Sequence, residues 1–254
     1  MTQKNIWENK VAIVTGGSSG IGRATALALV TQGANVLITG RSAEKLATVT
    51  AAHPKVHHLQ ADSADPANCA SIIKEALGKW GRLDLIVNNA GAGQPMPVEA
   101  YDAETITNMC ITNITSPSLM IKEGRAALRE TKGAVVNIGT AVSQNAAPGL
   151  AHYAATKTAL ESLTKSWAIE MAGDGIRVNM VAPGPVKSGA LTGMMGLPEN
   201  MAEKIERQEA AQVPLGRRGT PDDIAPWILK LGSSDNEWLT GQTLTVDGGW
   251  ASRS

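Results

Sequence analysis

The stretch Val11-Ala-Ile-Val-Thr-Gly-Gly-Ser-Ser-Gly-Ile-Gly22 decides the fold that we expect for this chain. Its β-branched run predicts a buried strand over 11–15, and a helical pattern over 21–31 follows it and is stopped by Gly33. Glycines between a strand and a helix let a phosphate approach closely, and the helix start offers free N–H groups to it. A tight turn that binds nothing is the alternative, but the strand before and the helix after favour a pyrophosphate site.

Strands and helices alternate along the rest of the chain. Further apolar runs predict strands at 34–39, 56–60, 83–87, 134–138, 176–181 and 243–246. Helices are expected after the capping residue Ser42, from Asp65-Pro66 to about Lys79, over 103–130 with a break near Ser116-Pro117, over 153–171, and from Thr220-Pro221 onward. This alternation predicts a single α/β domain over 1–254, a Rossmann-type doubly wound parallel sheet with helices on both faces.

The composition is that of a folded protein without a charge bias. The 254 residues are 43% hydrophobic and 18% charged, with a formal net charge of +0. This balance argues against a nucleic-acid or anionic-membrane surface. Cys69 and Cys110 are too few and too far apart for a disulfide framework, and no apolar run has the length of a signal core or a membrane span. We therefore expect a cytoplasmic protein whose partners include neither nucleic acid nor membrane.

Three histidines, His53, His57 and His58, lie close together in the sequence but do not suggest a metal site. Pro54 breaks any helix between them, and on a strand His57 and His58 point to opposite faces. We therefore expect no metal.

The end of the second predicted strand indicates which nicotinamide cofactor is bound. In a dinucleotide-binding fold an acidic residue just past this strand selects NAD, whereas an arginine accommodates the 2′-phosphate of NADP. Here Gly40 occupies the position and Arg41 follows it. We expect NADP(H) rather than NAD(H), unless Arg41 is only a solvated loop residue.

Polar residues also follow the third and fourth predicted strands. Asp62, ahead of Ser63, could accept a hydrogen bond from an adenine amino group or could form a turn. The small and amide residues of Asn88-Asn-Ala-Gly91 fit a ligand crevice at the carboxyl ends of the strands, with a polar turn as the alternative.

Tyr153 and Lys157 are a candidate acid–base pair. Four residues make about one helical turn, so both side chains lie on the same face of the predicted helix. A phenol titrates near ~10, and a neighbouring ammonium lowers its pKa by stabilising the phenolate. Such pairs also occur on ordinary helix surfaces, but the glycine-rich turn favours a catalytic role.

Residues 186–214 are rich in methionine and glycine. A long adaptable segment of this kind predicts a lid over an apolar pocket, and we define residues 187–213 as the lid segment. The alternative is a surface helix pair that packs its methionines on the body of the protein. The other walls of the pocket are expected from 92–97 and 141–152.

These motifs, in this order, closely resemble the short-chain dehydrogenase/reductase family over nearly the full chain. The glycine-rich turn resembles the family's cofactor loop, Asn88 to Gly91 its sheet motif, and Tyr153 with Lys157 its catalytic pair. Pro214-Leu-Gly-Arg217 and Asp247-Gly-Gly249 resemble its C-terminal signatures. The resemblance implies that the cofactor is bound by Gly16, Ser18, Ser19, Gly20, Ile21, Gly22, Gly40, Arg41, Ser42, Asp62, Ser63, Asn89, Ala90, Gly91, Tyr153, Lys157, Pro183, Gly184, Val186 and Ser188.

The catalytic set that the resemblance implies contains one departure. Where the family has a serine before the tyrosine, at the end of the fifth strand, this chain has Thr140. Threonine keeps the hydroxyl but has a stiffer χ1, so we assign it the serine's role and hold Ser143 in reserve. Asn113 matches a helix residue that holds a water in a proton relay, although a mid-helix asparagine usually faces solvent.

The implied reaction passes a hydride between NADP(H) and a carbonyl or secondary-alcohol substrate. Tyr153 gives or takes the proton of the oxygen, Thr140 fixes that oxygen, and Lys157 holds the nicotinamide ribose and lowers the pKa of the tyrosine. The family is commonly tetrameric, so the resemblance also implies a homotetramer.

Two alternatives remain open. A 3-oxoacyl-(acyl-carrier-protein) reductase would be favoured by a basic patch for the carrier, and Arg217-Arg218 is the one obvious cluster in the sequence. A non-catalytic NADP(H)-binding regulatory or scaffold protein is favoured by Thr140 alone and opposed by the intact Asn113, Tyr153 and Lys157. The fold also hosts dehydratases and epimerases.

Overall fold

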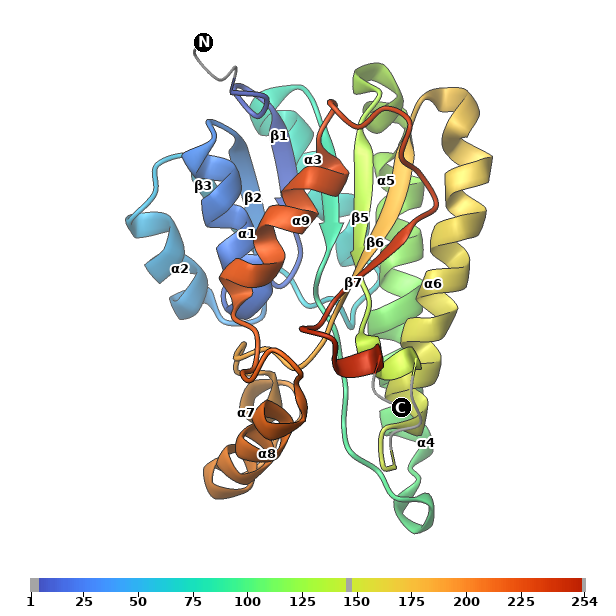
Figure 1. Ribbon diagram of the computed structural model, residues 1–254. Helices are drawn as coiled ribbons and strands as arrows, with labels where there is room; N and C mark the ends of the chain where they lie inside the picture. Colours follow the sequence, from blue (N-terminus) through green and yellow to red (C-terminus); the bar gives the residue numbers. More distant parts are fainter. Residues whose placement is uncertain (1–4, 145–147, 253–254) are drawn as a thin grey trace.

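The structure is a computed structural model that describes residues 5–144 and 148–252. These residues form one parallel sheet of seven strands in the order β3-β2-β1-β4-β5-β6-β7 (Figure 1). The strands are β1 Val11–Val14, β2 Asn35–Gly40, β3 Val56–Gln60, β4 Leu85–Asn88, β5 Ala134–Ile138, β6 Arg177–Pro183 and β7 Thr243–Val246. The strand order changes direction between β1 and β4, so the predicted doubly wound fold is confirmed.

Helices cover both faces of the sheet. The helices α1 Gly20–Thr31, α2 Ala43–Ala51 and α9 Pro221–Gly232 share one apolar cluster with the sheet. The opposite face is covered by α3 Asn68–Trp80, α5 Ser116–Thr131 and α6 Ala151–Met171. Three further helices lie beyond the carboxyl ends of the strands: α4 Ala103–Cys110, α7 Ala190–Gly193 and α8 Glu199–Gln212 (Figure 1). Short 3₁₀ turns occupy Val98–Ala100, Ala141–Gln144, Ala172–Asp174 and Trp250–Ser252.

The first strand illustrates how the core is built. Ala12 and Val14 point into the cluster with α1 and α9, whereas Val11 and Ile13 point into the cluster with α3 and α5. All four side chains are buried, as expected for a parallel strand covered on both sides. This is why the sequence reads as a continuous apolar run here rather than as an alternation.

Because the strands are parallel, the carboxyl ends of the central strands lie together at one end of the sheet, which we call the carboxyl edge. Val14 of β1 pairs with Val87 of β4, and Ile138 of β5 pairs with Val181 of β6. The loops that follow these strands therefore converge, and α4, α7 and α8 lie on the same side (Figure 1). Ligands of open α/β sheets bind in this crevice.

A buried polar chain joins β4, β5 and α6 just inside this edge. The Asn88 amide donates to the Asn137 carbonyl oxygen at 2.8 Å, and the Asn137 amide donates to the Thr164 hydroxyl at 2.8 Å. Asn88 therefore supports the sheet from within through its side-chain amide.

Two helix boundaries differ from the sequence expectations. The expectation that α3 starts at Asp65-Pro66 is wrong, because the Asp65 carboxylate accepts from the N–H of Ala67 in a turn and the helix begins at Asn68. The break near Ser116 is also wrong: α4 and α5 are joined without interruption by a π-helical turn over Ile111–Thr115. The caps at Ser42 and Thr220 are confirmed.

The length and apolar character of the helices bear on whether one of them could cross a membrane. Over residues 5–144 and 148–252, none combines the length and apolar character that a membrane span requires.

Candidate functional site

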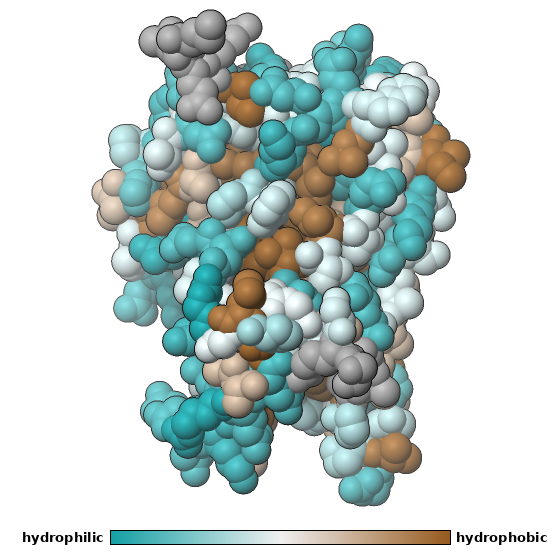
Figure 2. All heavy atoms as spheres, viewed as in Figure 1, coloured by the Kyte–Doolittle hydropathy of each residue, from teal (hydrophilic) through white to brown (hydrophobic). Residues whose placement is uncertain are grey.

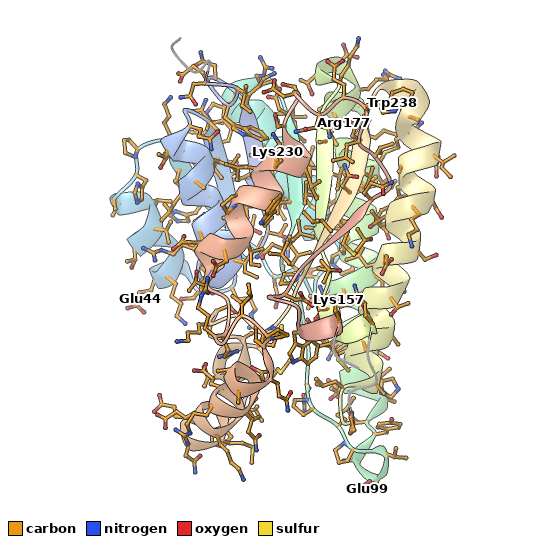
Figure 3. All side chains as sticks on the ribbon, in the orientation of Figure 1. Glu44, Glu99, Lys157, Arg177, Lys230 and Trp238 are labelled. Carbon is orange, nitrogen blue, oxygen red and sulfur yellow. The ribbon has the colours of Figure 1, made fainter. Side chains whose placement is uncertain are left out.

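The chemistry-bearing residues gather at the carboxyl edge of the sheet. Figure 3 shows Lys157, on α6, at this end and Arg177 near the opposite end. Arg177 donates to the carbonyls of Leu231, Gly232 and Ser233 at 2.8–3.0 Å, which closes the C-terminal end of α9. The polar contacts of Arg177 therefore stabilise the fold at one end of the sheet, and the candidate site lies at the other end, where the carboxyl ends of the strands meet.

The glycine-rich turn after β1 is held against the end of β4. The Thr15 hydroxyl accepts hydrogen bonds from the N–H groups of Asn89 and Ala90, each at 3.0 Å. The Asn89 amide donates to the carbonyls of Thr15 at 2.8 Å and Gly16 at 3.3 Å. Asn89, predicted to touch the cofactor, thus has its amide committed to shaping the turn.

Two glycines in this turn are required by its geometry. Gly16 has a φ of +65°, which L side chains rarely adopt. A Cβ on Gly22 would lie 2.4 Å from the amide nitrogen of Asn89, so any side chain there would push α1 away from β4. Ser19 is the N-cap of α1, and its side chain makes no capping hydrogen bond. The first turn of α1, which lies within the described residues, carries no acidic residue. The start of α1 therefore suits an anion such as a pyrophosphate.

Tyr153 and Lys157 are both buried, with 9% and 4% of their surfaces exposed. The Lys157 amine donates to the carbonyl of Ile138, the last residue of β5, at 2.8 Å. The Tyr153 hydroxyl is hydrogen-bonded with the buried hydroxyl of Thr140. Ser143 is turned elsewhere, since its hydroxyl donates to the Thr140 carbonyl at 2.7 Å. Of the two candidate hydroxyls, it is Thr140 that lies beside Tyr153.

Burial governs the acidities of this pair. Removal from water raises the pKa of Tyr153 above its usual value, and the hydrogen bond with Thr140 acts in the opposite direction. Burial also lowers the pKa of Lys157 from 10.5 to about 8. The Lys157 amine is hydrogen-bonded to the Ile138 carbonyl, and burial is the main influence on the pKa of Tyr153, so the lowering of that pKa by Lys157 stays a prediction. Tyr153 is therefore a neutral phenol at pH 7 that can donate a proton.

Asn113 joins the loop after β4 to α6. It lies in the π-helical turn and is 1% exposed, so it does not face solvent. Its carbonyl oxygen accepts from the N–H of Ala92 at 2.9 Å, and its amide donates to the Ala92 carbonyl at 2.8 Å and the Thr156 hydroxyl at 2.9 Å. The Thr156 hydroxyl donates in turn to the Tyr153 carbonyl at 2.8 Å. Asn113 thus sets the position of the loop relative to the turn of α6 that carries Tyr153.

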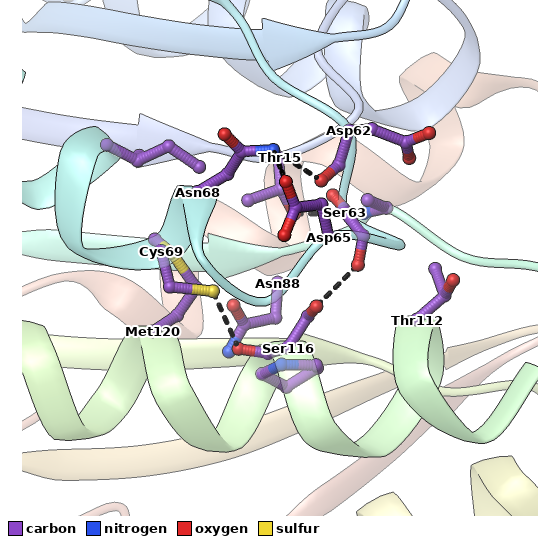
Figure 4. A pocket seen from close by; sticks show the side chains of 13 residues that line it. Thr15, Asp62, Ser63, Asp65, Asn68, Cys69, Asn88, Thr112, Ser116 and Met120 are labelled. Carbon is purple, nitrogen blue, oxygen red and sulfur yellow. Dashed lines mark hydrogen bonds between the residues drawn. The ribbon is translucent and has the colours of Figure 1, made fainter. Parts of the chain in front are cut away.

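A pocket of ≈ 290 Å³, including its opening to solvent, lies beside the ends of β1, β3 and β4 (Figure 4). Its lining residues include Thr15, Asp62, Ser63, Asn88, Ala90, Thr112 and Ser116. The Asp62 carboxylate accepts from the N–H of Ala64 at 2.9 Å, and the Ser63 carbonyl accepts from the Ser116 hydroxyl. Asp62 therefore forms a turn and also lines the pocket, and its contact with an adenine stays a prediction.

The end of β2 gathers Ser18, Gly40, Arg41 and Ser42. A Cβ on Gly40 would lie 3.2 Å from the Ser18 hydroxyl oxygen, so residue 40 directly adjoins Ser18. Arg41 is exposed, and the Ser42 hydroxyl caps α2 by accepting from the N–H of Lys45 at 3.3 Å. A hydroxyl, a guanidinium and a helix start together suit a phosphate group.

The segment after β6, residues 184–188, lies across the glycine-rich turn, and we call it the β6 loop. A Cβ on Gly184 would lie 2.5 Å from the Cβ of Asp247, so this position has room for glycine alone. The Ser188 carbonyl oxygen lies 2.9 Å from the position of a Cβ on Gly20, and Val186 is buried. The structure therefore brings the predicted residues of the β6 loop next to the start of α1.

The remaining predicted cofactor contacts also lie at this edge. Ala90 lines the pocket, and a Cβ on Gly91 would lie 3.4 Å from the Lys157 amine nitrogen. Ile21 is partly buried against the core at the start of α1, and Pro183 is the last residue of β6.

Methionines cover the apolar side of Tyr153. Met96, Met109 and Tyr153 form a buried cluster, and Met194 packs against it. Met194 follows α7 and belongs to the lid segment, whereas Met201 of α8 is 50% exposed. Met194 packs beside Tyr153 while α8 is a surface helix, and the function of the segment as a lid stays a prediction.

Sequence reasoning missed Thr15 and Thr156 as supports of the site. Thr15 directly precedes the glycines and Thr156 lies between Tyr153 and Lys157, so their positions were a signal. Their partners Asn89 and Asn113, however, are 74 and 43 residues away, which no local pattern encodes.

The histidines of β3 do not converge. His57 packs edge-on against Trp80, with ring centroids 5.7 Å apart, while His58 contacts the Thr50 hydroxyl at 3.2 Å. In the part of the chain that the structure describes, no group of three or more His, Cys, Asp or Glu is arranged to hold a metal ion.

Comparison with known proteins gives consistent relatives over nearly the full chain. A family model described as enoyl-(acyl carrier protein) reductase matches residues 16–251. A 3-oxoacyl-(acyl-carrier-protein) reductase of Thermotoga maritima is 31% identical over 249 residues, which cover 95% of this chain and 98% of the relative. The corresponding reductase of Staphylococcus aureus is 34% identical over 246 residues, with coverages of 94% and 97%. An uncharacterised oxidoreductase of Methylorubrum extorquens is 36% identical over 249 residues, with coverages of 95% and 98%.

A solved structure extends the likeness to three dimensions. A short-chain dehydrogenase/reductase of unknown function from Caenorhabditis elegans, solved with its cofactor, superposes with a TM-score of 0.92. The sequences are 33% identical, and the match covers 98% of this chain and 97% of that chain.

The buried amine of Lys157 should lower the stability of the folded protein at neutral pH. Between about pH 8 and 10 the unfolded chain carries a proton on this amine that the folded protein lacks, so stability rises with pH in that window. We expect Lys157→Met, without added cofactor, to be about 2 kcal/mol more stable than wild type at pH 7, after the lost hydrogen bond is allowed for. Urea unfolding at pH 7 and at pH 9.5 measures this, and the gap should shrink at the higher pH.

Lys165→Met is the matched control for this experiment. Lys165 lies on the same helix but is 58% exposed, in an i,i+4 pair with Glu161, so its replacement should change stability by less than about 0.5 kcal/mol. A Lys157→Met protein less stable than wild type at pH 7 would contradict the burial argument.

Proposed function

Because the chain belongs to the short-chain dehydrogenase/reductase family of oxidoreductases, we propose that it transfers a hydride between NADP(H) and a carbonyl or secondary-alcohol substrate. The observation that carries this proposal is the buried hydroxyl of Tyr153 next to that of Thr140 at the carboxyl edge of the sheet. A neutral phenol beside a second hydroxyl can both orient a carbonyl oxygen and protonate it.

The residues present fit a dinucleotide laid along this edge. The glycine-rich turn and the open start of α1 suit a pyrophosphate, and the pocket beside Asp62 suits an adenine. Lys157 and the β6 loop suit the nicotinamide end, where NADP(H), when bound, supplies or accepts the hydride. The proposal includes all the cofactor-binding residues that the resemblance to the family implies.

The four catalytic candidates have distinct roles in this proposal. Tyr153 gives its proton to the substrate oxygen during reduction and takes one back during oxidation, and Thr140 orients that oxygen. Lys157 holds the ribose hydroxyls and stabilises the phenolate that Tyr153 becomes. Both amide hydrogens of Asn113 are already used, so a relay water would be held by its carbonyl oxygen alone.

The preference for NADP(H) over NAD(H) is supported by the corner at the end of β2. Residue 40 is a glycine and so lacks the carboxylate that an NAD site uses, and the Arg41 guanidinium and the Ser18 hydroxyl lie next to it for a 2′-phosphate.

A 3-oxoacyl-(acyl-carrier-protein) reductase is a second candidate, because two of the relatives above carry that name. The structure removes one argument for it. Arg217 is paired with Asp223 at 2.7 Å and Arg218 is buried, so these two residues do not form an exposed basic patch. A non-catalytic NADP(H)-binding protein is less favoured, because Thr140 lies where the family serine is needed.

We also propose that the protein assembles as a homotetramer. β7 is an edge strand whose residues are only partly buried, and Trp227 of α9 is 45% exposed. Figure 2 shows apolar side chains on this face, over α9 and β7. An unpaired strand edge with apolar neighbours is a surface that a second copy can cover. The cytoplasmic location expected from the sequence stays a prediction.

Replacing Tyr153 should separate chemistry from cofactor binding. Tyr153→Phe keeps the ring and removes the transferable proton, so we expect turnover of an NADPH-coupled ketone panel to fall by at least about 10²-fold. NADPH binding, followed by fluorescence, should persist. Tyr101→Phe is the matched control, since the chain has 2 tyrosines and Tyr101 is 42% exposed at the surface. Wild-type rates in Tyr153→Phe would contradict the assignment of Tyr153 as the catalytic acid and base.

Replacing Arg41 should change cofactor preference. Arg41→Ala removes the cation available for the 2′-phosphate, so NADPH should bind about tenfold more weakly while NADH binding stays the same. Fluorescence titration of wild type and Arg41→Ala with NADPH and with NADH measures this, and the NADH titration is the control. Equal losses for the two, or tighter NADH binding by the wild type, would refute the proposed preference.

The assembly proposal is tested by light scattering. The mass in solution should be four times that of the 26.5 kDa chain. A clean monomer would refute it without bearing on the chemistry.

A further inference from the structure

Arg218 is a buried cation between the lid segment and the β6 loop. Its side chain is 4% exposed, and its guanidinium forms ion pairs with Glu206 and, at 3.0 Å, with Glu209 of α8. The other side of the guanidinium donates to the carbonyl of Val186 at 2.9 Å. One side chain therefore contacts both the helix of the lid segment and the loop at the cofactor site.

The backbone next to Arg218 is paired with the β6 loop. Gly219 forms a parallel bridge with Val186, donates to the Pro185 carbonyl at 2.9 Å and accepts from the N–H of Lys187 at 2.9 Å. The same loop continues to Ser188, whose carbonyl lies against Gly20 of the glycine-rich turn. Arg218 is thus fixed to the cofactor side of the site, and its head group reaches out to α8.

The helix α8 has little apolar attachment of its own. Of its fourteen residues, all within the described part of the chain, Ala202 is the one that is buried. Figure 2 shows the region of α7 and α8, at the lower left, as predominantly hydrophilic. Val213, just after the helix, is buried against the C-terminal segment, so the end of α8 is anchored while its body is not. The ion pairs with Arg218 are what hold the body of α8 in place.

A guanidinium suits this position better than other cations. Its planar fork can face two carboxylates and a carbonyl at once, which a lysine ammonium on a flexible stem does poorly. Removing it would leave Glu206 and Glu209 as two like charges in a partly buried site. Uncompensated buried charges are costly, and α8 would relieve that cost by moving out into water.

We propose that Arg218 is a positioning residue that couples the lid helix α8 to the cofactor site. The inference rests on the proposed function for the nature of the two ligands. In the coupled arrangement, a cofactor that orders the β6 loop also orders α8, and the substrate beside Met194 of the same lid segment binds more tightly. Because such coupling is reciprocal, loss of Arg218 weakens both effects together.

Limited trypsin digestion reads the position of α8 directly. Lys204 and Arg207 are exposed cleavage points within this helix. In the wild type, NADPH should slow cleavage at Lys204. In Arg218→Met, cleavage there should be about tenfold faster and insensitive to NADPH, and the KM of a ketone that the wild type reduces should rise about tenfold with little change in kcat. Arg218→Lys should restore these properties only in part.

The matched control is Arg207→Met. Arg207 is on the same helix, 73% exposed, and pairs with the exposed Glu203 at 3.7 Å. This variant should keep wild-type cleavage at Lys204 and wild-type protection by NADPH. If Arg218→Met does not fold, Glu206→Gln with Glu209→Gln removes the same ion pairs from the side of α8 and should give the same loss of protection.

The outcomes distinguish the inference from the proposed function. Wild-type cleavage, NADPH protection and KM in Arg218→Met, or in the double glutamine variant, would overturn the role of Arg218. Failure of the wild type to bind NADPH would instead refute the proposed function. A parallel loss of kcat and thermal stability, with NADPH protection retained, would make Arg218 a merely structural residue and would also overturn the inference.

Discussion

The side-chain amide of Asn113 is the interaction on which the site depends. One buried amide makes three hydrogen bonds, to both backbone groups of Ala92 and to the hydroxyl of Thr156. These bonds hold the loop after β4 at a set distance from α6, and the Thr156 hydroxyl passes the constraint to the backbone of Tyr153. Apolar packing alone tolerates small slips, whereas an amide with its partners at fixed angles does not. The π-helical turn places Asn113 in the interior, consistent with such turns marking functional positions.

Burial links the chemistry of this site to its energetic cost. The same removal from water raises the pKa of Tyr153 and lowers that of Lys157 to about 8, so the groups best suited to catalysis are also unfavourable to bury. The fully covered strands of the sheet supply the compensating apolar burial. The lid segment is built differently, with a polar helix attached through Arg218, and a weakly attached element of this kind can open without unfolding the core.

The order of elements followed from the sequence because the signals that define them are local. Strand runs, caps such as Ser42 and Thr220, and glycine turns act over a few residues, and the structure agrees with them. The errors arose where local signals competed. Asp65 has the chemistry of a helix cap but forms a turn first. A break was expected at Ser116-Pro117, but the helix continues through these residues after a π-helical turn.

The sequence by itself determined the doubly wound fold, the glycine-rich turn and the same-face pairing of Tyr153 with Lys157, because these depend on periodicity and spacing. Only the tertiary structure decided that Thr140 rather than Ser143 meets Tyr153, and that Asn113 turns inward. It also decided the direction of the Tyr153 pKa shift. The physical reason is that the acidity of a group and the partner of a hydroxyl depend on atoms within a few ångströms in space, and those atoms come from segments far apart in the chain.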